Sequence, residues 1–271
     1  MRTDVGSAGS YIIRGGVEGR ERLRVMAGVL APMARTLLER LPVRPGERCW
    51  DVGSGGGDVT RMIAEMVGPT GRVLGTDIDP AKVALARAES VAYPQVEYRV
   101  LDIQGQEPGE TFDIAHVRFL LSHLTEPGVA VAAIGRAVRP GGVLAVADVD
   151  FGVPVCCPDL PAYRAFCELY VRTGRHHGAD PLIGPRLPLL LHAAGFTDIR
   201  IQIDQPAEPD PAIKLVHVLT LESIADAALD AGLVSAAEMA AMLADLRAAV
   251  DDSSMVLAAP RIVQAWARKP R

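Results

Sequence analysis

Hydrophobic and polar positions along the chain follow two alternating spacings. Short apolar runs that end at glycine, proline or aspartate indicate buried strands, and apolar residues three and four positions apart indicate helices between them. The strands are expected at residues 48–52, 72–76, 96–101, 112–115, 143–149, 197–203 and roughly 255–267. Strands that alternate with helices form parallel sheets through right-handed crossovers. The pattern therefore predicts an α/β fold built on a doubly wound sheet.

Some of the predicted helices are additional to those that connect the strands of such a sheet. One helical stretch precedes the first strand, and further helices are expected at about 159–174 and within 211–250. We divide the chain into an N-terminal helical cap (1–41), a core (42–150), and the rest of the core sheet with inserted lid helices (151–271). Open α/β sheets bind ligands at the carboxyl ends of their strands. The cap and the inserted helices are therefore expected to form a lid over a pocket at that edge.

A glycine loop, GSGGG at residues 53–57, directly follows the first predicted strand. Such a loop serves any ligand that lies close to the backbone. A dinucleotide fingerprint would place another glycine three residues after Gly55, where this sequence has Asp58, and a P-loop would require a following Gly-Lys pair. An acid at the start of a helix disfavours a pyrophosphate there. The loop is therefore expected to hold a ligand without phosphates, which argues against nicotinamide-dependent reduction.

Two further acidic residues stand at predicted strand ends. Asp77 follows the second strand, where a carboxylate can accept hydrogen bonds from both hydroxyls of a ribose, and Asp102 follows the third, where an acceptor suits the amine of an adenine. Ile78 and Ile103 are placed to cover the two faces of the purine. The alternative for Asp77 is a helix cap, a role that suits Asp79 better. The alternative for Asp102 is an ordinary turn residue.

Five segments carry these features in order along the chain. They are CWDVGSGGG (49–57), GTDID (75–79), VLDI (100–103), FDIAHVRFLLSHL (112–124) and RPGG (139–142). Together they resemble successive motifs of the class I S-adenosylmethionine-dependent methyltransferases. The resemblance implies a Rossmann-like sheet of seven strands whose last strand is antiparallel. It also implies S-adenosyl-L-methionine as the cofactor and S-adenosyl-L-homocysteine as the product.

The same resemblance implies which residues contact the cofactor. It assigns the methionine part to Gly53, Ser54 and Gly55, the ribose to Asp77, and the adenine to Asp102 and Ile103. The second loop residue, often Cys in the family, is Ser54 here. This departure should matter little, because the backbone makes the contact.

Residues after the fourth strand are candidates for the chemistry around the methyl group. Arg118 would contact the cofactor carboxylate, or else lie on a solvated helix face. His123 would act as a general base on an acceptor hydroxyl, a role that a His at a similar place has in some small-molecule members of the family, or else pack beneath the methionine part. His176 and His177 would reach the pocket only if the inserted helix folds as a lid; otherwise they end a solvated helix.

We expect no metal site. Asp148 and Asp150 lie two positions apart on a strand, which directs both carboxylates to one side, but the Asp-Asn pair of the metal-dependent, catechol-type members is missing. The adjacent Cys156 and Cys157 have no further cysteine spaced to complete a trithiolate. The four cysteines of the chain form neither a disulfide framework nor a Cys-x-x-Cys pair, which favours a reducing cytoplasm.

The composition limits the expected partners. The 271 residues are 49% hydrophobic and carry a formal net charge of -5, and the arginines are scattered rather than grouped, which argues against a nucleic-acid partner. No apolar run approaches the ~20 residues of a membrane helix, and the N-terminus lacks the apolar region of a signal peptide. The oligomeric state is not predicted.

These observations predict an S-adenosylmethionine-dependent methyltransferase that methylates an O, N or C atom of a small, fairly apolar metabolite. The alternative is a protein of the same fold that uses the cofactor structurally, as a binding module or a cyclase.

Overall fold

The protein is built around one seven-stranded sheet. The computed structural model describes residues 16–271, without the side chains of residues 16–21 and 23. The strands of the sheet are β1 (Arg48–Val52), β2 (Arg72–Asp77), β3 (Val96–Val100), β4 (Phe112–Arg118), β5 (Val138–Asp150), β7 (Thr197–Asp204) and β9 (Arg261–Arg268). Their order is β3-β2-β1-β4-β5-β9-β7. The first five pair in parallel, and β9 runs antiparallel to both β5 and β7. The predicted Rossmann-like sheet with an antiparallel last strand is confirmed.

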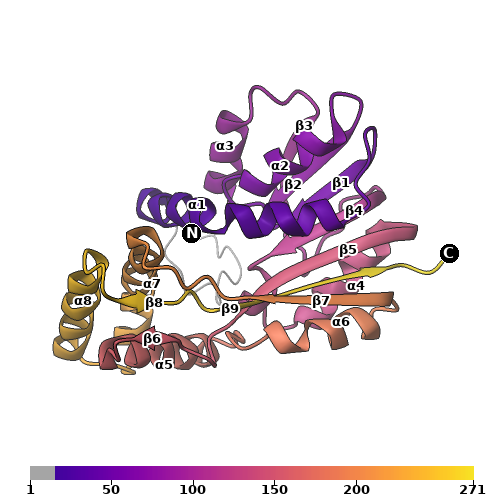
Figure 1. The fold of residues 1–271 in the computed structure, drawn as a ribbon. Helices are drawn as coiled ribbons and strands as arrows, with labels where there is room; N and C mark the ends of the chain where they lie inside the picture. The colour runs from indigo at the N-terminus through magenta and orange to yellow at the C-terminus, as the bar shows by residue number, and fades with distance from the viewer. Residues whose placement is uncertain (1–15) are drawn as a thin grey trace, which may run out of the picture.

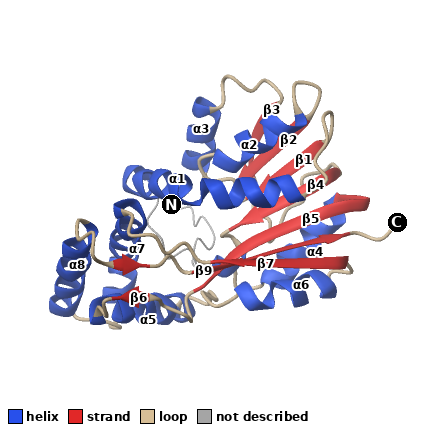
Figure 2. Cartoon of the chain, viewed as in Figure 1, coloured by secondary structure: helices blue, strands red, loops and turns tan. Residues whose placement is uncertain are grey.

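Helices cover both faces of this sheet (Figure 2). They are α1 (Gly16–Arg40), α2 (Asp58–Val67), α3 (Pro80–Glu89), α4 (Pro127–Ala137) and α6 (Leu187–Ala193). On one face, Leu38 of α1 and Ile63 of α2 join buried strand residues in a common cluster. On the other face, Ile134 of α4 and Leu191 of α6 are fully buried against the sheet. Each helix thus buries the apolar stripe that its sequence spacing predicts.

A separate group of elements stands beyond the carboxyl ends of the strands (Figure 1). It consists of α5 (Pro161–His176), α7 (Pro211–Asp230), α8 (Ala236–Val250) and a two-stranded ribbon of β6 (Cys156–Cys157) and β8 (Val256–Leu257). Phe166, Leu221 and Leu246 are buried in its own apolar cluster. Asp210 caps α7 through the backbone N–H of Ala212, and a capping box at Ser235 starts α8. α1 packs against α7 and so closes this group over the sheet.

The last predicted strand, at 255–267, is divided in the structure. β8 pairs with β6 in the ribbon, whereas β9 enters the main sheet. Pro260, which has no N–H to give to a ladder, lies between them. The N–H groups of Ala258 and Ala259 donate to loop carbonyls at 2.9 and 2.8 Å instead. The prediction of one continuous strand was wrong, because apolar spacing alone does not show where the pairing partner changes.

The fourth strand is longer than the sequence predicts. It continues from residue 115 to Arg118, and a short 3-10 helix (Leu121–His123) follows it. Arg118 therefore ends a strand, and the alternative of a solvated helix face is wrong. Residues 1–15 of the predicted cap lie outside the described residues.

Candidate active site

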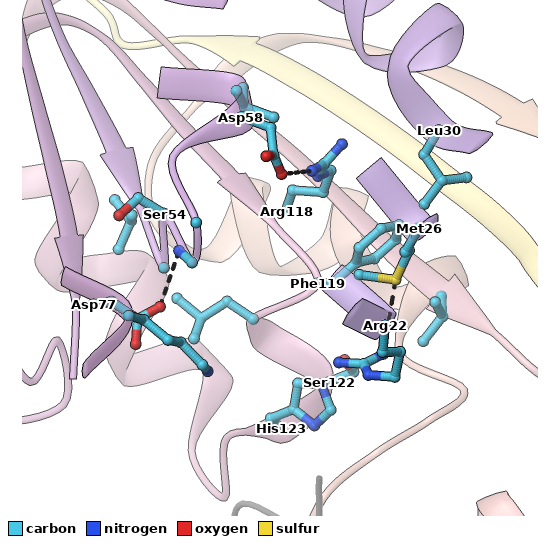
Figure 3. Close-up of a pocket in the computed structure, with 18 of the residues that line it drawn as sticks. Arg22, Met26, Leu30, Ser54, Asp58, Asp77, Arg118, Phe119, Ser122 and His123 are labelled. Atoms are coloured by element: carbon cyan, nitrogen blue, oxygen red, sulfur yellow. Dashed lines mark hydrogen bonds and ion pairs between the residues drawn. The ribbon is translucent and has the colours of Figure 1, made fainter. Parts of the chain in front are cut away.

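A cavity of about 600 Å³ lies between the carboxyl ends of β1, β2 and β4 and the helices α1, α5 and α7 (Figure 3). This volume falls within the range of typical small-molecule sites. The wall includes every site residue that the sequence predicts, namely Gly53, Ser54, Gly55, Asp77, Ile78, Asp102, Ile103, Arg118 and His123. α8, predicted as part of the lid, contributes none of the wall residues that the structure describes, and packs behind α5 and α7 instead.

The glycine loop turns sharply at the cavity because three of its glycines have left-handed backbone. The φ angles are 72° at Gly53, 53° at Gly55 and 80° at Gly57, a region that costs a residue with a Cβ roughly 1–2 kcal/mol. The N–H of Ser54 donates to the carbonyl of Thr76 at 2.8 Å, which joins the loop to β2. The loop thus presents bare backbone to the cavity, as a ligand that lies close to the chain requires.

Asp77 connects this loop to the end of β2. Its side chain is only 8% exposed. One carboxylate oxygen accepts the N–H of Gly55 at 3.0 Å (Figure 3). The other oxygen accepts the N–H of Asp79 at 3.0 Å. Asp79, not Asp77, caps α3, because its side chain accepts the N–H of Ala81 at 2.8 Å. Each oxygen of Asp77 therefore keeps lone-pair capacity directed at the cavity.

The predicted adenine end lies at the close of β3. Asp102 is half-buried, and one of its oxygens accepts the N–H of Gln104 at 2.9 Å, which fixes the carboxylate in the turn. Ile103 is buried, whereas Ile78 is 60% exposed, an unusual position for a large apolar side chain at a cavity wall. The turn interpretation and the acceptor interpretation of Asp102 are thus compatible, since the turn uses only one of its two carboxylate oxygens.

Arg118 brings a cationic group to the glycine loop. Its guanidinium lies 3.8 Å from Asp58 (Figure 3). Arg61 approaches the other oxygen of Asp58 at 3.2 Å. Burial raises the pKa of Asp58 above its ordinary value, and the two arginines oppose that rise. A separation of 3.8 Å is too long for a hydrogen bond. Arg118 therefore neutralises Asp58 without committing its donors to it.

His123 is a buried and electrically neutral histidine. Burial, together with the nearby positive charges of Arg22 and Lys82, lowers its pKa to about 3. Figure 3 places the ring beside Ser122 and the guanidinium of Arg22. A base beside two fixed positive charges would have to take up its proton against their repulsion. The surroundings therefore favour the packed alternative for His123 over the role of base.

Two wall residues that the sequence did not point to are Arg22 and Phe119. Arg22 of α1 is 6% exposed, donates to the Sδ of Met26 at 3.8 Å, and has a buried Nε without a partner among the described residues. Phe119 has a φ of 52°, a conformation that costs energy in a bulky residue and clusters at functional sites. Its ring lies 5.6 Å from the guanidinium carbon of Arg118. Arg22 lies in a charged helical stretch and Phe119 lies in an apolar run, and neither pattern indicates a residue of a binding site.

The helices α1, α5 and α7 form a roof over the cavity, and the end of the cavity beneath this roof is mainly apolar. Its lining residues come from α1, β5, α5 and α7, and include Met26, Val29, Leu30, Val149, Phe151, Phe166, Ile213 and Val216. Tyr170 stacks on Phe151 with ring centroids 4.1 Å apart. The cavity therefore has a polar end at the strand termini and an apolar end under the helices.

Other sequence candidates lie outside the cavity. His176 and His177 end α5, where His177 contacts the carbonyl of Thr173 at 3.0 Å, so the solvated helix end is the correct alternative. Asp148 accepts the N–H of Ser122 at 3.0 Å, whereas Asp150 pairs with Arg261. These two carboxylates thus have separate partners. In the described part of the chain, no three His, Cys, Asp or Glu side chains are grouped as metal ligands. The four cysteines are unpaired.

The strand order, the glycine loop after β1 and the acid that ends β2 define the class I S-adenosylmethionine-dependent methyltransferase fold. Comparison with known families agrees: residues 50–144 match the model of a methyltransferase domain. Residues 50–144 thus carry the methyltransferase domain, and the chain as a whole shares the fold of this class. The family, fold and cofactor predicted from the sequence are confirmed.

Curated relatives match part of the chain. An uncharacterized 37.1 kDa protein in transposon Tn4556 of Streptomyces fradiae is 34% identical over 167 residues, 59% of this chain and 46% of that protein. The ubiquinone/menaquinone biosynthesis C-methyltransferase UbiE of Teredinibacter turnerae is 33% identical over 125 residues, 43% of this chain and 48% of that protein. The chain thus spans about half the length of the curated relatives it matches.

Solved structures share the fold at low identity. A provisionally assigned methyltransferase from Bacillus halodurans superposes with a TM-score of 0.58 at 20% identity, over 88% of this chain and 99% of that one. The phosphoethanolamine N-methyltransferase 2 of Haemonchus contortus gives 0.54 at 19% identity, over 97% and 55%. The [4+2]-cyclase SpnF gives 0.51 at 22% identity, over 88% and 81%. These likenesses concern the fold.

No helix that the structure describes is long and apolar enough to cross a membrane.

Proposed function

We propose that the chain binds S-adenosyl-L-methionine in this cavity and transfers its methyl group to a small, fairly apolar molecule. The observation that carries the proposal is the convergence of the glycine loop and the Asp77 carboxylate at one end of a cavity whose other end is apolar. Methyl transfer is a displacement at carbon, so the protein has mainly to align the reactants and exclude water.

The residues at the polar end fit this cofactor. The Oγ of Ser54 is buried and has no hydrogen-bond partner among the described residues. Asp77 keeps an acceptor position on each oxygen for the ribose hydroxyls, and Arg118 offers donors to the carboxylate of the methionine part. When bound, the cofactor supplies a methyl group on a positively charged sulfur. Asp102, Ile78 and Ile103 would hold its adenine.

The apolar end supports a small-molecule acceptor. Its lining by Met, Val, Leu, Ile and aromatic side chains would exclude water and strengthen electrostatic effects at the sulfur. The net charge of -5 gives a nucleic acid no electrostatic attraction, and we propose neither a nucleic-acid nor a membrane partner. The unpaired cysteines suit a reducing cytoplasm.

Calorimetry with S-adenosyl-L-homocysteine and a transfer assay together test the proposal. We expect binding to the purified chain, and release of labelled product when methyl-labelled cofactor is incubated with a metabolite extract. Binding without release would favour the structural use of the cofactor, as in a binding module or a cyclase. Absence of binding, or protection against thermal unfolding by NADH in its place, would contradict the proposal.

A further inference from the structure

The roof of the cavity contains one histidine between two aromatic rings. His217 of α7 is 2% exposed and lies in the cavity wall. Its ring meets Tyr163 and Phe166 of α5 edge-on, with centroids 5.1 and 5.7 Å apart. An imidazole in such apolar surroundings is costly unless its nitrogens find hydrogen-bond partners. The partners of its two nitrogens therefore show what it can do.

One side of the ring faces backbone carbonyls. The backbone carbonyls of Leu257 and Ala258, where β8 ends, favour the protonated form of the imidazole and so raise its pKa. The hydroxyl of Tyr163 donates to the carbonyl of Ala258 at 2.6 Å, which fixes the position of that carbonyl. Carbonyl oxygens only accept, so the ring nitrogen that faces them carries a proton. The other nitrogen, Nε2, is buried and has no partner among the described residues.

This arrangement leaves one ring nitrogen of a cavity-wall residue without a partner among the described residues. Burial lowers the pKa of His217 to about 4, although the two carbonyls favour the protonated ring. The imidazole is therefore neutral at physiological pH, and its second nitrogen presents a lone pair. A buried acceptor without a donor is a strained feature of a native protein and calls for an explanation.

We propose that Nε2 of His217 accepts a hydrogen bond from an O–H or N–H group of the methyl acceptor. This inference rests on the proposed function and specifies its substrate: an apolar molecule that carries a hydroxyl or an amine. In the transfer, the acceptor heteroatom forms the bond to the methyl carbon as the carbon–sulfur bond breaks. The bonding pair stays on sulfur, and the heteroatom's proton passes to Nε2.

The neighbouring groups make His217 better suited to this proton than His123. The carbonyls of Leu257 and Ala258 stabilise a protonated imidazole, whereas Arg22 and Lys82 oppose protonation of His123. The transfer also removes the positive charge of the sulfonium as the imidazolium forms. The number of positive charges in the cavity thus stays constant, so the second cation does not have to be buried beside the first.

Nitrogen NMR of the full chain with ¹⁵N-labelled histidine tests the resting state. We expect His217, identified by its absence in His217→Gln, to keep one protonated and one unprotonated nitrogen from pH 8 to pH 5. A proton on Nε2, or a ring that titrates near pH 6.5, would overturn the proposal.

Paired ligands test the recognition. With S-adenosyl-L-homocysteine bound, 1-naphthol and similar phenols and amines are compared with their methyl ethers or N-methylated forms. We expect the hydrogen-bond donors to shift the Nε2 resonance and to bind about tenfold more tightly than their methylated partners. A panel in which no donor moves Nε2, or in which both members of each pair bind equally, would overturn the inference.

Two variants separate the acceptor from the fold. His217→Asn keeps an amide N–H for the carbonyls and removes the acceptor at the Nε2 position, whereas His217→Gln extends an amide to that position. We expect the His217→Asn variant to lose the preference for ligands that donate a hydrogen bond, and the His217→Gln variant to retain much of it. The cofactor affinity should be unchanged in both variants. If the unaltered chain does not bind S-adenosyl-L-homocysteine, the proposed function itself is refuted.

Discussion

The carboxylate of Asp77 accepts a hydrogen bond from the backbone N–H of Gly55 at 3.0 Å. This bond joins the end of β2 to the glycine loop that follows β1. The group proposed to bind the ribose thus also holds the backbone proposed to contact the methionine part. Cofactor binding and loop geometry therefore depend on the same side chain.

Asp77→Ala is expected to weaken S-adenosyl-L-homocysteine binding by at least about a hundredfold, because two hydrogen bonds to a charged acceptor are lost together with the loop contact. Calorimetry measures the change. Asp79→Ala is the matched control: it removes the cap of α3 at a cost of about 1 kcal/mol in folding stability, but is expected to leave the affinity nearly unchanged. Unaltered affinity in Asp77→Ala would contradict the site.

Arg118→Met is expected to reduce affinity for S-adenosyl-L-homocysteine about tenfold, since a charge-assisted hydrogen bond to the methionine carboxylate is removed. The affinity for 5′-methylthioadenosine, which lacks this carboxylate, should stay the same. Arg61→Met serves as the control, because Arg61 also pairs with Asp58 but is absent from the described cavity wall. Equal losses for both ligands would show that Arg118 only supports the loop.

Gly57→Ala is expected to lower the free energy of unfolding by about 2–4 kcal/mol, from left-handed backbone and from overlap. A Cβ at Gly57, where φ is 80°, would lie 2.2 Å from the hydroxyl of Tyr98. Gly56→Ala is the control, because its nearest neighbour would be the Asp58 carboxylate at 4.0 Å. Urea unfolding of both variants measures the difference, and similar stabilities would contradict the packing described for the loop.

The cofactor end of the site was more predictable than the acceptor end. Asp77 and Asp102 each follow a parallel strand, and the carboxyl ends of parallel strands necessarily meet at one edge of the sheet. Strand spacing therefore brings them together without knowledge of side-chain packing. The position of Arg118 at the end of a strand was missed only because β4 is three residues longer than its apolar run suggests.

The residues of the roof that face the cavity could not be predicted from the sequence in the same way. α7 has buried residues around most of its circumference, including Lys214, His217 and Leu221. Its apolar pattern therefore does not indicate which face meets the cavity. Arg22 lies in a stretch rich in arginine and glutamate, which is typical of a solvated helix. The roles of both residues depend on how the roof helices dock, and this is decided by tertiary packing.

The buried carboxyl of Asp148 makes a prediction about pH. The side chain is fully buried beneath the 3-10 helix that carries Ser122 and His123, and accepts N–H bonds from Ser122 and Val149 at 3.0 and 2.9 Å. Burial outweighs these bonds and raises its pKa from 3.8 to about 6. Between about pH 4 and pH 6, the folded chain therefore holds a proton that the unfolded chain has released.

Stability conferred by the protonated Asp148 is thus present below about pH 4, is lost as the pH rises to about 6, and stays lost above it. Asp148→Asn keeps the shape without the ionisation. The free energy of unfolding of this variant, relative to the parent, is expected to rise by up to about 3 kcal/mol across that window. Urea titrations at pH 4 to 8 measure it. Because the buried histidines titrate alike in both chains, they cancel in the difference, and parallel curves would show that Asp148 ionises normally in the fold.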